Sequence, residues 1–377
     1  MSIVIAKDAV REPLYAIVPV FNPWRYKSRY KHTARALKHF HDSGVVIVLV
    51  EAAFNRREHV FADSGLDGAL AECNVLGDRH FKHKYLALRT KDELWLKENL
   101  INLGVAMLPH DWQQVCWLDS DVIFVRPNWA GASIHKLQHY KFLQMFSHAR
   151  DLGPNYEMLP EDYPHASGLS FVEAYRTDRL LTISEGKLRR HDRDHRHQRH
   201  HHPSPDPCPP LYPPYLPTVW PGLAWACTRQ AWEEVGGLLD FAVWGGGDHH
   251  MSHALIEDPY NMMMRNDLHS NYQQLVNAWM LNCKKYVRRN LGCVEGIITH
   301  SWHGRKIERG YNKKHALLAQ IKFDPLSHLK RDFQGLYQLN DDGSEAYIQL
   351  RDNLRKIASD RNEDSIDTFV PQLGQGH

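Results

Sequence analysis

Apolar runs of strand length alternate with amphipathic stretches along the first third of the chain. The runs at 15–21 and 45–50 are continuous, and an amphipathic stretch at 25–41 separates them. Continuous apolar runs on either side of a helix are typical of parallel strands that are buried on both faces. Residues 91–103 then show helical spacing, and another apolar run follows at 114–118. The pattern predicts an α/β fold built on an open, mostly parallel sheet flanked by helices.

The composition changes abruptly at 187–217. Residues 189–202 hold six His and five Arg, and residues 203–217 hold eight of the 20 prolines of the chain. Such a mixture cannot bury apolar area or complete a strand ladder, so we expect an inserted, largely disordered loop. The stretch beyond about Ser359 is polar, and we expect it to fray.

Composition and charge exclude several classes of protein. With 43% hydrophobic and 24% charged residues, the chain is typical of a globular protein that folds in water. The net charge of +2 indicates no general polyanion partner. No apolar run approaches the roughly 18 residues that a membrane span needs, and the N-terminus lacks a signal-peptide pattern. We therefore expect a cytoplasmic protein without a membrane span.

Two carboxylates follow the apolar run at 114–118. Asp119 and Asp121 flank Ser120, and in an extended backbone residues i and i+2 point to the same side. Their oxygens suit one hard divalent cation, at the sheet edge where open α/β sheets bind ligands. The alternative is a structural turn, rich in Asp, that caps the next element.

A glycine-rich segment, Trp244 to His250, precedes a stretch with helical spacing. Its three glycines permit a close backbone approach, and Asp248 would begin the helix, where free N–H groups stabilise an ionised carboxylate. Such a carboxylate in a cleft acts as a general base. The alternative is an ordinary turn in which Asp248 is the N-cap.

A late pair of histidines lies beside aromatic and basic residues. His300 and His303 flank Trp302, and Arg305 and Lys306 follow. These residue types supply a metal ligand, an aromatic wall and cations that neutralise a diphosphate. A lone histidine is more often structural, so the pattern gains weight only together with the other motifs.

In this order the motifs resemble glycosyltransferases of the GT-A fold, especially the β-1,4-galactosyltransferase and polypeptide N-acetylgalactosaminyltransferase group. The segments that carry the resemblance are 17–22, 97–104, the Asp119 to Asp121 strand end, 222–237, 244–248 and the late histidine. The secreted members carry a membrane anchor and a stem, so the chain is more similar to a cytosolic bacterial or phage-type relative.

The resemblance implies a domain layout. A GT-A domain would cover 1–335, with a nucleotide-sugar-binding half at 1–125, the inserted loop at 187–217 and an acceptor and metal-closing half at 218–335. Residues 336–377 would form a C-terminal helix and a polar tail.

The resemblance also assigns roles to residues. Asp248 would be the catalytic base, although the family has several adjacent acids where this chain has His249 and His250. A Mn²⁺ or Mg²⁺ ion would bind Asp119, Asp121 and His300 or His303, between which the motif does not choose. Trp244, Gly246, Gly247 and Trp302 would contact the acceptor. The donor would contact Pro19, Phe21, Glu51, Asn102, Asp119, Ser120, Asp121 and Lys306.

We therefore expect metal-dependent transfer of a sugar from a nucleotide sugar, first of all a UDP-sugar, to an acceptor hydroxyl on a glycan or on a hydroxymethylated base of phage DNA. One alternative is a nucleotidyltransferase of the same fold, but the segment after the first strand, 22–25, lacks the usual glycine-rich basic loop. Another is a non-catalytic nucleic-acid or carbohydrate-binding module that uses the basic loop and the 11 tryptophans.

Overall fold

The computed structural model describes residues 12–62, 83–160, 163, 165–184, 187–190, 218–263, 265–309 and 311–367. The expected disordered loop lies outside these residues from 191 onward. Residues 187–190 form strand β10 (Lys187–Arg190), which pairs antiparallel with β9 (Leu181–Ser184), so the expectation of disorder was wrong for these four residues.

The central sheet has seven strands in the described residues, in the order β13-β6-β12-β4-β1-β2-β3. Four neighbouring strands are parallel, which are β1 (Tyr15–Phe21), β2 (Val46–Phe54), β3 (Lys84–Thr90) and β4 (Gln114–Leu118). Strand β12 (Ala224–Thr228) runs antiparallel to β4 and to β6 (Phe142–Gln144), and β13 (Leu291–Cys293) runs parallel to β6. The predicted α/β fold with a mixed, mostly parallel sheet is confirmed.

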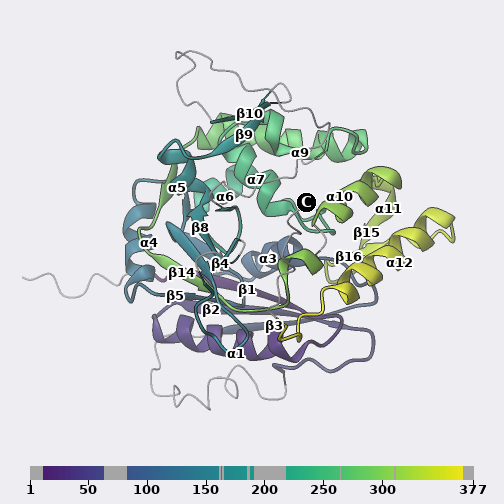
Figure 1. Cartoon of the computed structure of the whole chain (residues 1–377), viewed down its shortest axis with the longest axis horizontal. Helices are drawn as coiled ribbons and strands as arrows, with labels where there is room; N and C mark the ends of the chain where they lie inside the picture. The colour runs from purple at the N-terminus through teal and green to yellow at the C-terminus, as the bar shows by residue number, and fades with distance from the viewer. Residues whose placement is uncertain are drawn as a thin grey trace, which may run out of the picture.

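Both faces of the central sheet are buried, as the continuous apolar runs predicted. Ile17 and Val48 belong to one core cluster, whereas their neighbours Val18 and Ile47 belong to the other. Helices α1 (Lys27–Asp42) and α4 (Trp129–Leu137) pack on one face (Figure 1). The other face carries α3 (Lys97–Ala106), α6 (Arg229–Val235), α7 (Gly247–Leu255) and α9 (Ser270–Asn282).

A smaller, five-stranded sheet stands beside the central one, in the order β11-β8-β7-β14-β5. The chain leaves the central sheet at the end of β4 and enters the smaller sheet at β5, so residues 119–121 connect the two sheets. The strands are β11 (Thr218–Trp220), β8 (Ser167–Ser170), β7 (His148–Asp151), β14 (Ile297–His300) and β5 (Val122–Phe124).

The C-terminal elements pack onto the main core. The hairpin β15 (Leu329–Arg331) and β16 (Tyr337–Leu339) spans the expected boundary at 335, and helix α12 (Glu345–Asp360) follows it. Leu336, Leu350 and Leu354 join the same core cluster as the central sheet. The remaining elements are α5 (Phe171–Arg176), α8 (Pro259–Met262), the π-helix η1 (Cys283–Val287), the 3-10 helix η2 (Lys306–Arg309), α10 (Tyr311–Gln320) and α11 (Pro325–His328).

Most tryptophans are core residues. Nine of the 11 are buried, and Trp129 is fully enclosed, with its ring stacked on Phe124 at 4.1 Å between centroids. This burial argues against a binding surface made of exposed tryptophans. Among the described helices, none has the length and apolar character required to cross a membrane.

Candidate functional site

The turn at 119–121 lies at the carboxyl edge of the central sheet, where β1, β2 and β4 end. Its backbone is held from two sides, because the Asp119 N–H donates to the Leu223 carbonyl at 2.8 Å and the Ser301 N–H donates to the Asp121 carbonyl at 2.8 Å. The segments before β12 and after β14 therefore converge on this turn. Open α/β sheets place their ligand sites at this edge.

Among the described residues, Asp121, His300 and His303 form a candidate cation-binding triad. Asp121 Oδ2 lies 3.6 Å from His300 Nε2 and 3.5 Å from His303 Nε2. Strand pairing explains part of this geometry, because β14 places His300 opposite Val122, next to Asp121. Both histidines, between which the sequence did not choose, reach the same carboxylate.

The triad has the character of a metal site. Its ligand atoms all lie within 4.8 Å of one another, and the buried Asp121 Oδ1 has no hydrogen-bond partner. A carboxylate suits Mg²⁺ or Mn²⁺, whereas imidazole nitrogens suit softer first-row ions such as Zn²⁺ and Fe²⁺. Of the two cations expected from the sequence, the two histidines favour Mn²⁺ over Mg²⁺.

Asp151 orients His300 through Nδ1, the ring nitrogen that does not face Asp121. Strand β7 runs parallel to β14 and places Asp151 opposite His300, so His300 Nδ1 lies 2.7 Å from Asp151 Oδ1. A carboxylate that receives the second ring N–H of a ligating histidine fixes its tautomer and orientation. Lys306, expected at the donor, instead contacts the other oxygen of Asp151 at 2.6 Å and lies over the Trp220 ring.

The charges of the triad are set by its neighbours. Burial lowers the pKa of His300, but Asp121 and Asp151 outweigh burial and raise that pKa to about 9. Burial raises the pKa of Asp121, but His300 holds it well below its ordinary value. Burial and Arg309 lower the pKa of His303, which is therefore neutral. Without a cation, a protonated His300 links two carboxylates.

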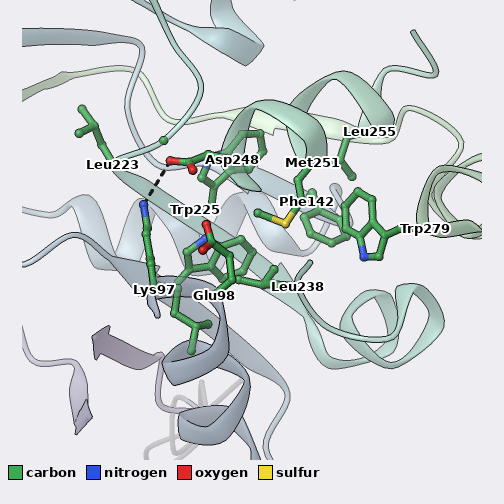
Figure 2. A pocket seen from close by; sticks show the side chains of 13 residues that line it. Lys97, Glu98, Phe142, Leu223, Trp225, Leu238, Asp248, Met251, Leu255 and Trp279 are labelled. Carbon is green, nitrogen blue, oxygen red and sulfur yellow. Dashed lines mark hydrogen bonds and ion pairs between the residues drawn. The ribbon is translucent and has the colours of Figure 1, made fainter. Parts of the chain in front are cut away.

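Lys97 joins the other carboxylate of the turn to Asp248. Its ammonium lies 2.6 Å from Asp119 Oδ1 and 3.2 Å from Asp248 Oδ2. Lys97 begins α3 and Asp248 stands in the first turn of α7, and Figure 2 shows their side chains meeting at the mouth of a cavity. Asp119, expected among the metal ligands, thus contacts Lys97 rather than the two histidines.

The cavity beside Asp248 holds a second buried acid. Glu98 is 2% exposed, and its Oε1 has no hydrogen-bond partner. Burial, followed by Asp248, raises the pKa of Glu98 to about 8, so this carboxyl is protonated at neutral pH. Burial likewise raises the pKa of Asp119 to about 6, although Lys97 opposes it. Apolar side chains form the far wall of this narrow cavity.

The glycines around Asp248 are required by close packing. Gly245 and Gly246 have φ of 86° and 90°, in the left-handed region that favours glycine. A Cβ on Gly247 would lie 2.5 Å from Glu98 Oε1, and one on Gly222 would lie 2.2 Å from Asp248 Oδ2. Gly222 and Gly247 therefore let the acidic side chains of Asp248 and Glu98 come close to the backbone.

The histidines after Asp248 belong to the core. His249 Nε2 lies 2.8 Å from the Asn261 carbonyl, and His250 contacts the Met262 carbonyl and the Tyr272 hydroxyl. Burial lowers the pKa of both, that of His250 to about 4. Neither histidine supplies an acid, whereas Glu98, from a different helix, places a carboxyl beside Gly247.

Several residues expected at the donor are engaged in internal contacts. The Glu51 carboxylate accepts the Val60 and Phe61 N–H groups and the Tyr85 hydroxyl, which holds the loop after β2. Asn102 hydrogen-bonds the Leu238 backbone and Asp240.

The other expected residues lie around the same sheet edge. Pro19 and Phe21 are buried in β1, Ser120 is half-buried in the turn, and Trp244 is buried beside the cavity at the end of β1. The Trp302 indole donates to the Ser365 carbonyl at 2.6 Å, and its own carbonyl contacts His32.

Lys97, Glu98 and Asp151 were not predicted from the sequence as site residues. One sequence signal could have indicated Lys97 and Glu98. They are charged residues in a helix that is buried on most sides, and buried charges are often functional. Asp151 follows a short strand and gives no local signal.

Fold and site together define an α/β protein with a candidate cation site, made of a carboxylate and two histidines, at the carboxyl edge of its sheet and an acidic cavity beside it. No protein-family model and no curated protein sequence matches the chain. Solved structures similar to it share little sequence. They include S. aureus TarS 1–349, with 14% identity, coverage of 47% of each chain and a TM-score of 0.25. The chain thus matches about half the length of that protein.

Two further similar structures cover more of the chain. The mannosyltransferase PcManGT from Pyrobaculum calidifontis, in complex with GDP-Man and Mn²⁺, has 10% identity, a TM-score of 0.38 and coverage of 94% of this chain and 74% of its own. Glucosyl-3-phosphoglycerate synthase from Mycobacterium tuberculosis, in complex with Mn²⁺, UDP and phosphoglyceric acid, has 9% identity, a TM-score of 0.31 and coverage of 84% and 77%. All three TM-scores are low, so the function is argued below from the site itself.

Proposed function

We propose that the protein is a cation-dependent glycosyltransferase of the GT-A type, which transfers a sugar from a nucleotide diphospho-sugar to an acceptor hydroxyl. The observation that carries the proposal is that the two aspartates of the turn at 119–121 contact different partners. Asp121 faces two histidines in a cation-binding triad, and Asp119 contacts the lysine that also holds Asp248. The cation site therefore lies next to a cluster of acids, Asp119, Asp248 and Glu98, at the carboxyl edge of the sheet. We call these three residues the acid cluster.

The triad would hold Mn²⁺ through Asp121, His300 and His303. When bound, such a cation supplies electrostatic stabilisation to a departing diphosphate. The chain contributes the orientation of the ligands, because Asp151 fixes the His300 ring from the side opposite Asp121.

Asp248 would accept the proton of the acceptor hydroxyl. Its position in the first turn of α7 and its contact with Lys97 hold this carboxylate at the edge of the cavity, where a general base would meet the acceptor hydroxyl. Glu98, protonated at neutral pH, stands close enough to feel the charge of Asp248. We propose that Lys97 and Glu98 keep Asp248 in one orientation.

The nucleotide would lie at the ends of β1 and β2. A small cavity there is lined by Asn22, Tyr30, Glu51 and Arg57, and it opens at the same sheet edge as the turn at 119–121. A UDP-sugar is the first donor to test.

The test is release of nucleoside diphosphate from a panel of UDP-, GDP- and CMP-sugars, with Mn²⁺, with Mg²⁺ and with EDTA. We expect Mn²⁺-dependent turnover of one donor, lost in Asp121→Asn. Asp248→Asn should keep nucleotide binding and lose about 10²–10⁴-fold in transfer rate. Asp352→Asn, at an exposed ion pair on α12, is the matched control. The proposal fails if no donor turns over, or if Asp121→Asn retains Mn²⁺-dependent turnover.

A further inference from the structure

The C-terminal segment 358–367 docks beside the cation triad, although its polar sequence predicted fraying. The Tyr26 hydroxyl donates to the carbonyls of Ala358 and Ser359, and the Asp364 carboxylate accepts the backbone N–H groups of Lys27 and Ser28. We call residues 358–367 the strap. It joins the start of α1 to the loop that carries His303, against which its backbone packs at Gly304.

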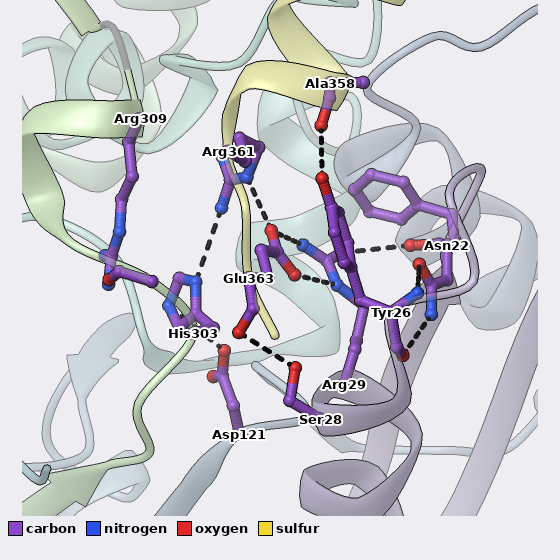
Figure 3. A network of polar contacts seen from close by, with 12 residues as sticks. Asn22, Tyr26, Ser28, Arg29, Asp121, His303, Arg309, Ala358, Arg361 and Glu363 are labelled. Carbon is purple, nitrogen blue, oxygen red and sulfur yellow. Dashed lines mark hydrogen bonds and ion pairs between the residues drawn. The ribbon is translucent and has the colours of Figure 1, made fainter. Parts of the chain in front are cut away.

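Glu363 is the centre of this docking. Its side chain is fully buried between the guanidinium groups of Arg29 and Arg361 (Figure 3). Arg29 Nε donates to Glu363 Oε2 at 2.8 Å, and the Glu363 carbonyl accepts the Ser28 hydroxyl at 3.1 Å. The other end of Arg361 lies 3.5 Å from His303 Nδ1. One carboxylate of the strap thus bridges two arginines, one of which contacts a residue of the triad.

A further buried cation lies near the two arginines. Lys314 is 5% exposed. Burial and then Arg361 lower the pKa of Lys314 to about 7, with smaller effects of the same sign from Arg309 and Arg29, while Glu363 raises it. Two guanidinium groups on one buried carboxylate are typical of a place that accommodates a more highly charged anion.

We propose that Arg29 and Arg361 form an anion subsite beside the cation triad, that Glu363 fills this subsite, and that the diphosphate of the donor competes with Glu363 for it. The inference rests on the proposed function and deepens it by assigning the diphosphate contacts to Arg29 and Arg361. Guanidinium groups bind carboxylate and phosphate oxygens in the same bidentate geometry, so one anion replaces the other without rearranging the arginines.

The exchange makes the strap responsive to the ligand. Glu363 and the diphosphate cannot both hold the two arginines, so an anion that binds there must displace the Glu363 side chain, and by reciprocity a weaker hold of Glu363 on the arginines must strengthen anion binding. The Glu363 carboxylate therefore sets the affinity of the subsite.

The test is calorimetric titration of the full chain with inorganic pyrophosphate, with and without Mn²⁺. Glu363→Gln removes the competing charge and keeps the shape, and we expect pyrophosphate to bind at least about tenfold more tightly than in the wild type. Arg361→Gln should bind at least about tenfold more weakly. Asp364→Asn is the matched control, because it removes a charge from the strap at the α1 start and leaves the contacts of Glu363 with Arg29 and Arg361 in place, so its affinity should stay closer to that of the wild type than the affinity of either variant.

These measurements test the anion subsite independently of the proposed function. Unchanged or weaker pyrophosphate binding in Glu363→Gln would overturn the inference, and so would unchanged binding in Arg361→Gln. If Glu363→Gln does not fold, Arg361→Gln against Asp364→Asn decides the question alone. The measurement without Mn²⁺ tests the arginines whether or not any sugar is transferred, whereas loss of Mn²⁺-dependent turnover in Asp121→Asn tests the glycosyltransferase proposal.

Discussion

The substitution Lys97→Met tests whether one cation holds the acid cluster together. The Lys97 ammonium contacts Asp119 at 2.6 Å and Asp248 at 3.2 Å, and its side chain is 10% exposed. Methionine keeps the length of the side chain and removes the charge. It leaves Asp119, Asp248 and Glu98 near one another without the cation that now offsets them.

The magnitude follows from the burial of the partners. Removing one member of a buried ion pair costs about 3–5 kcal/mol, and the 23% and 25% exposure of the two aspartate side chains reduces this to about 2–3 kcal/mol. An unfolding entropy of about 2.1 cal/mol/K per residue gives about 0.8 kcal/mol/K for 377 residues. We therefore expect the melting temperature to fall by roughly 2.5–4 °C.

The assay is thermal unfolding followed by circular dichroism, together with transfer rate. Lys38→Met is the control, since the Lys38 to Asp42 pair is about half exposed on α1 and should change stability by less than about 0.5 kcal/mol. The double variant Lys97→Met with Asp119→Asn should recover part of the lost stability, because one uncompensated charge is gone. A Lys97→Met protein as stable and as active as the Lys38→Met control would refute this reasoning.

Three further predictions concern the same edge of the sheet. The pKa of Glu98 is raised to about 8 in the folded protein. Between the ordinary pKa of a glutamate and about pH 8, the folded protein therefore keeps a proton on Glu98 that the unfolded chain has released. The free energy of unfolding of the wild type falls as the pH rises through this range. Glu98→Gln should therefore match the wild type near pH 5 and exceed it by at least about 1 kcal/mol near pH 8.5 in urea unfolding, whereas an equal pH dependence would contradict the pKa assignment. His303→Ala should abolish Mn²⁺ binding in calorimetry, and Asp151→Asn should weaken it about 10–100-fold; retention of full affinity in His303→Ala would remove it from the metal site. Gly222→Ala places a Cβ 2.2 Å from Asp248 Oδ2, so the transfer rate should fall nearly as far as in Asp248→Asn, while the melting temperature changes little because a side-chain end can move; wild-type rates would show that the carboxylate position does not matter.

The sheet could be predicted from the sequence because burial on both faces leaves a continuous apolar run. The runs at 15–21, 45–50 and 114–118 correspond to β1, β2 and β4. The short strands of the smaller sheet have three to four residues each, which is too few for an apolar period to appear. Their existence depends on pairing between distant segments.

The site was predicted where a motif carries its own chemistry. Asp121, His300 and His303 were named from residue type and position, and the structure brings them together. The contact between Lys97 and Asp248 joins residues that are 151 positions apart, so no local sequence pattern predicts it. The expectation that Asp119 and Asp121 point to the same side was wrong. The chain passes from one sheet to the other at 119–121, so the two carboxylates contact different partners.

The strap was mispredicted for a related reason. A polar composition predicts fraying only when its polar groups have no partners in the fold, and here Glu363 reaches Arg29, 334 positions away. A buried ion pair of this kind contributes little net stability by itself, but it makes one arrangement much more favourable than any that would bury an unpaired charge.

The junction between the two sheets explains why the proposed cation site and the proposed base stand side by side. Asp121 leads into β5 of the smaller sheet, which also brings His300 through β14, whereas Asp119 follows β4 of the central sheet, on which α3 and α7 place Lys97 and Asp248. Because a single residue separates the two aspartates, the spacing between cation site and base is set by how the sheets pack. A change that shifts one sheet against the other must therefore disturb both functions together, even if every side chain of the site is kept.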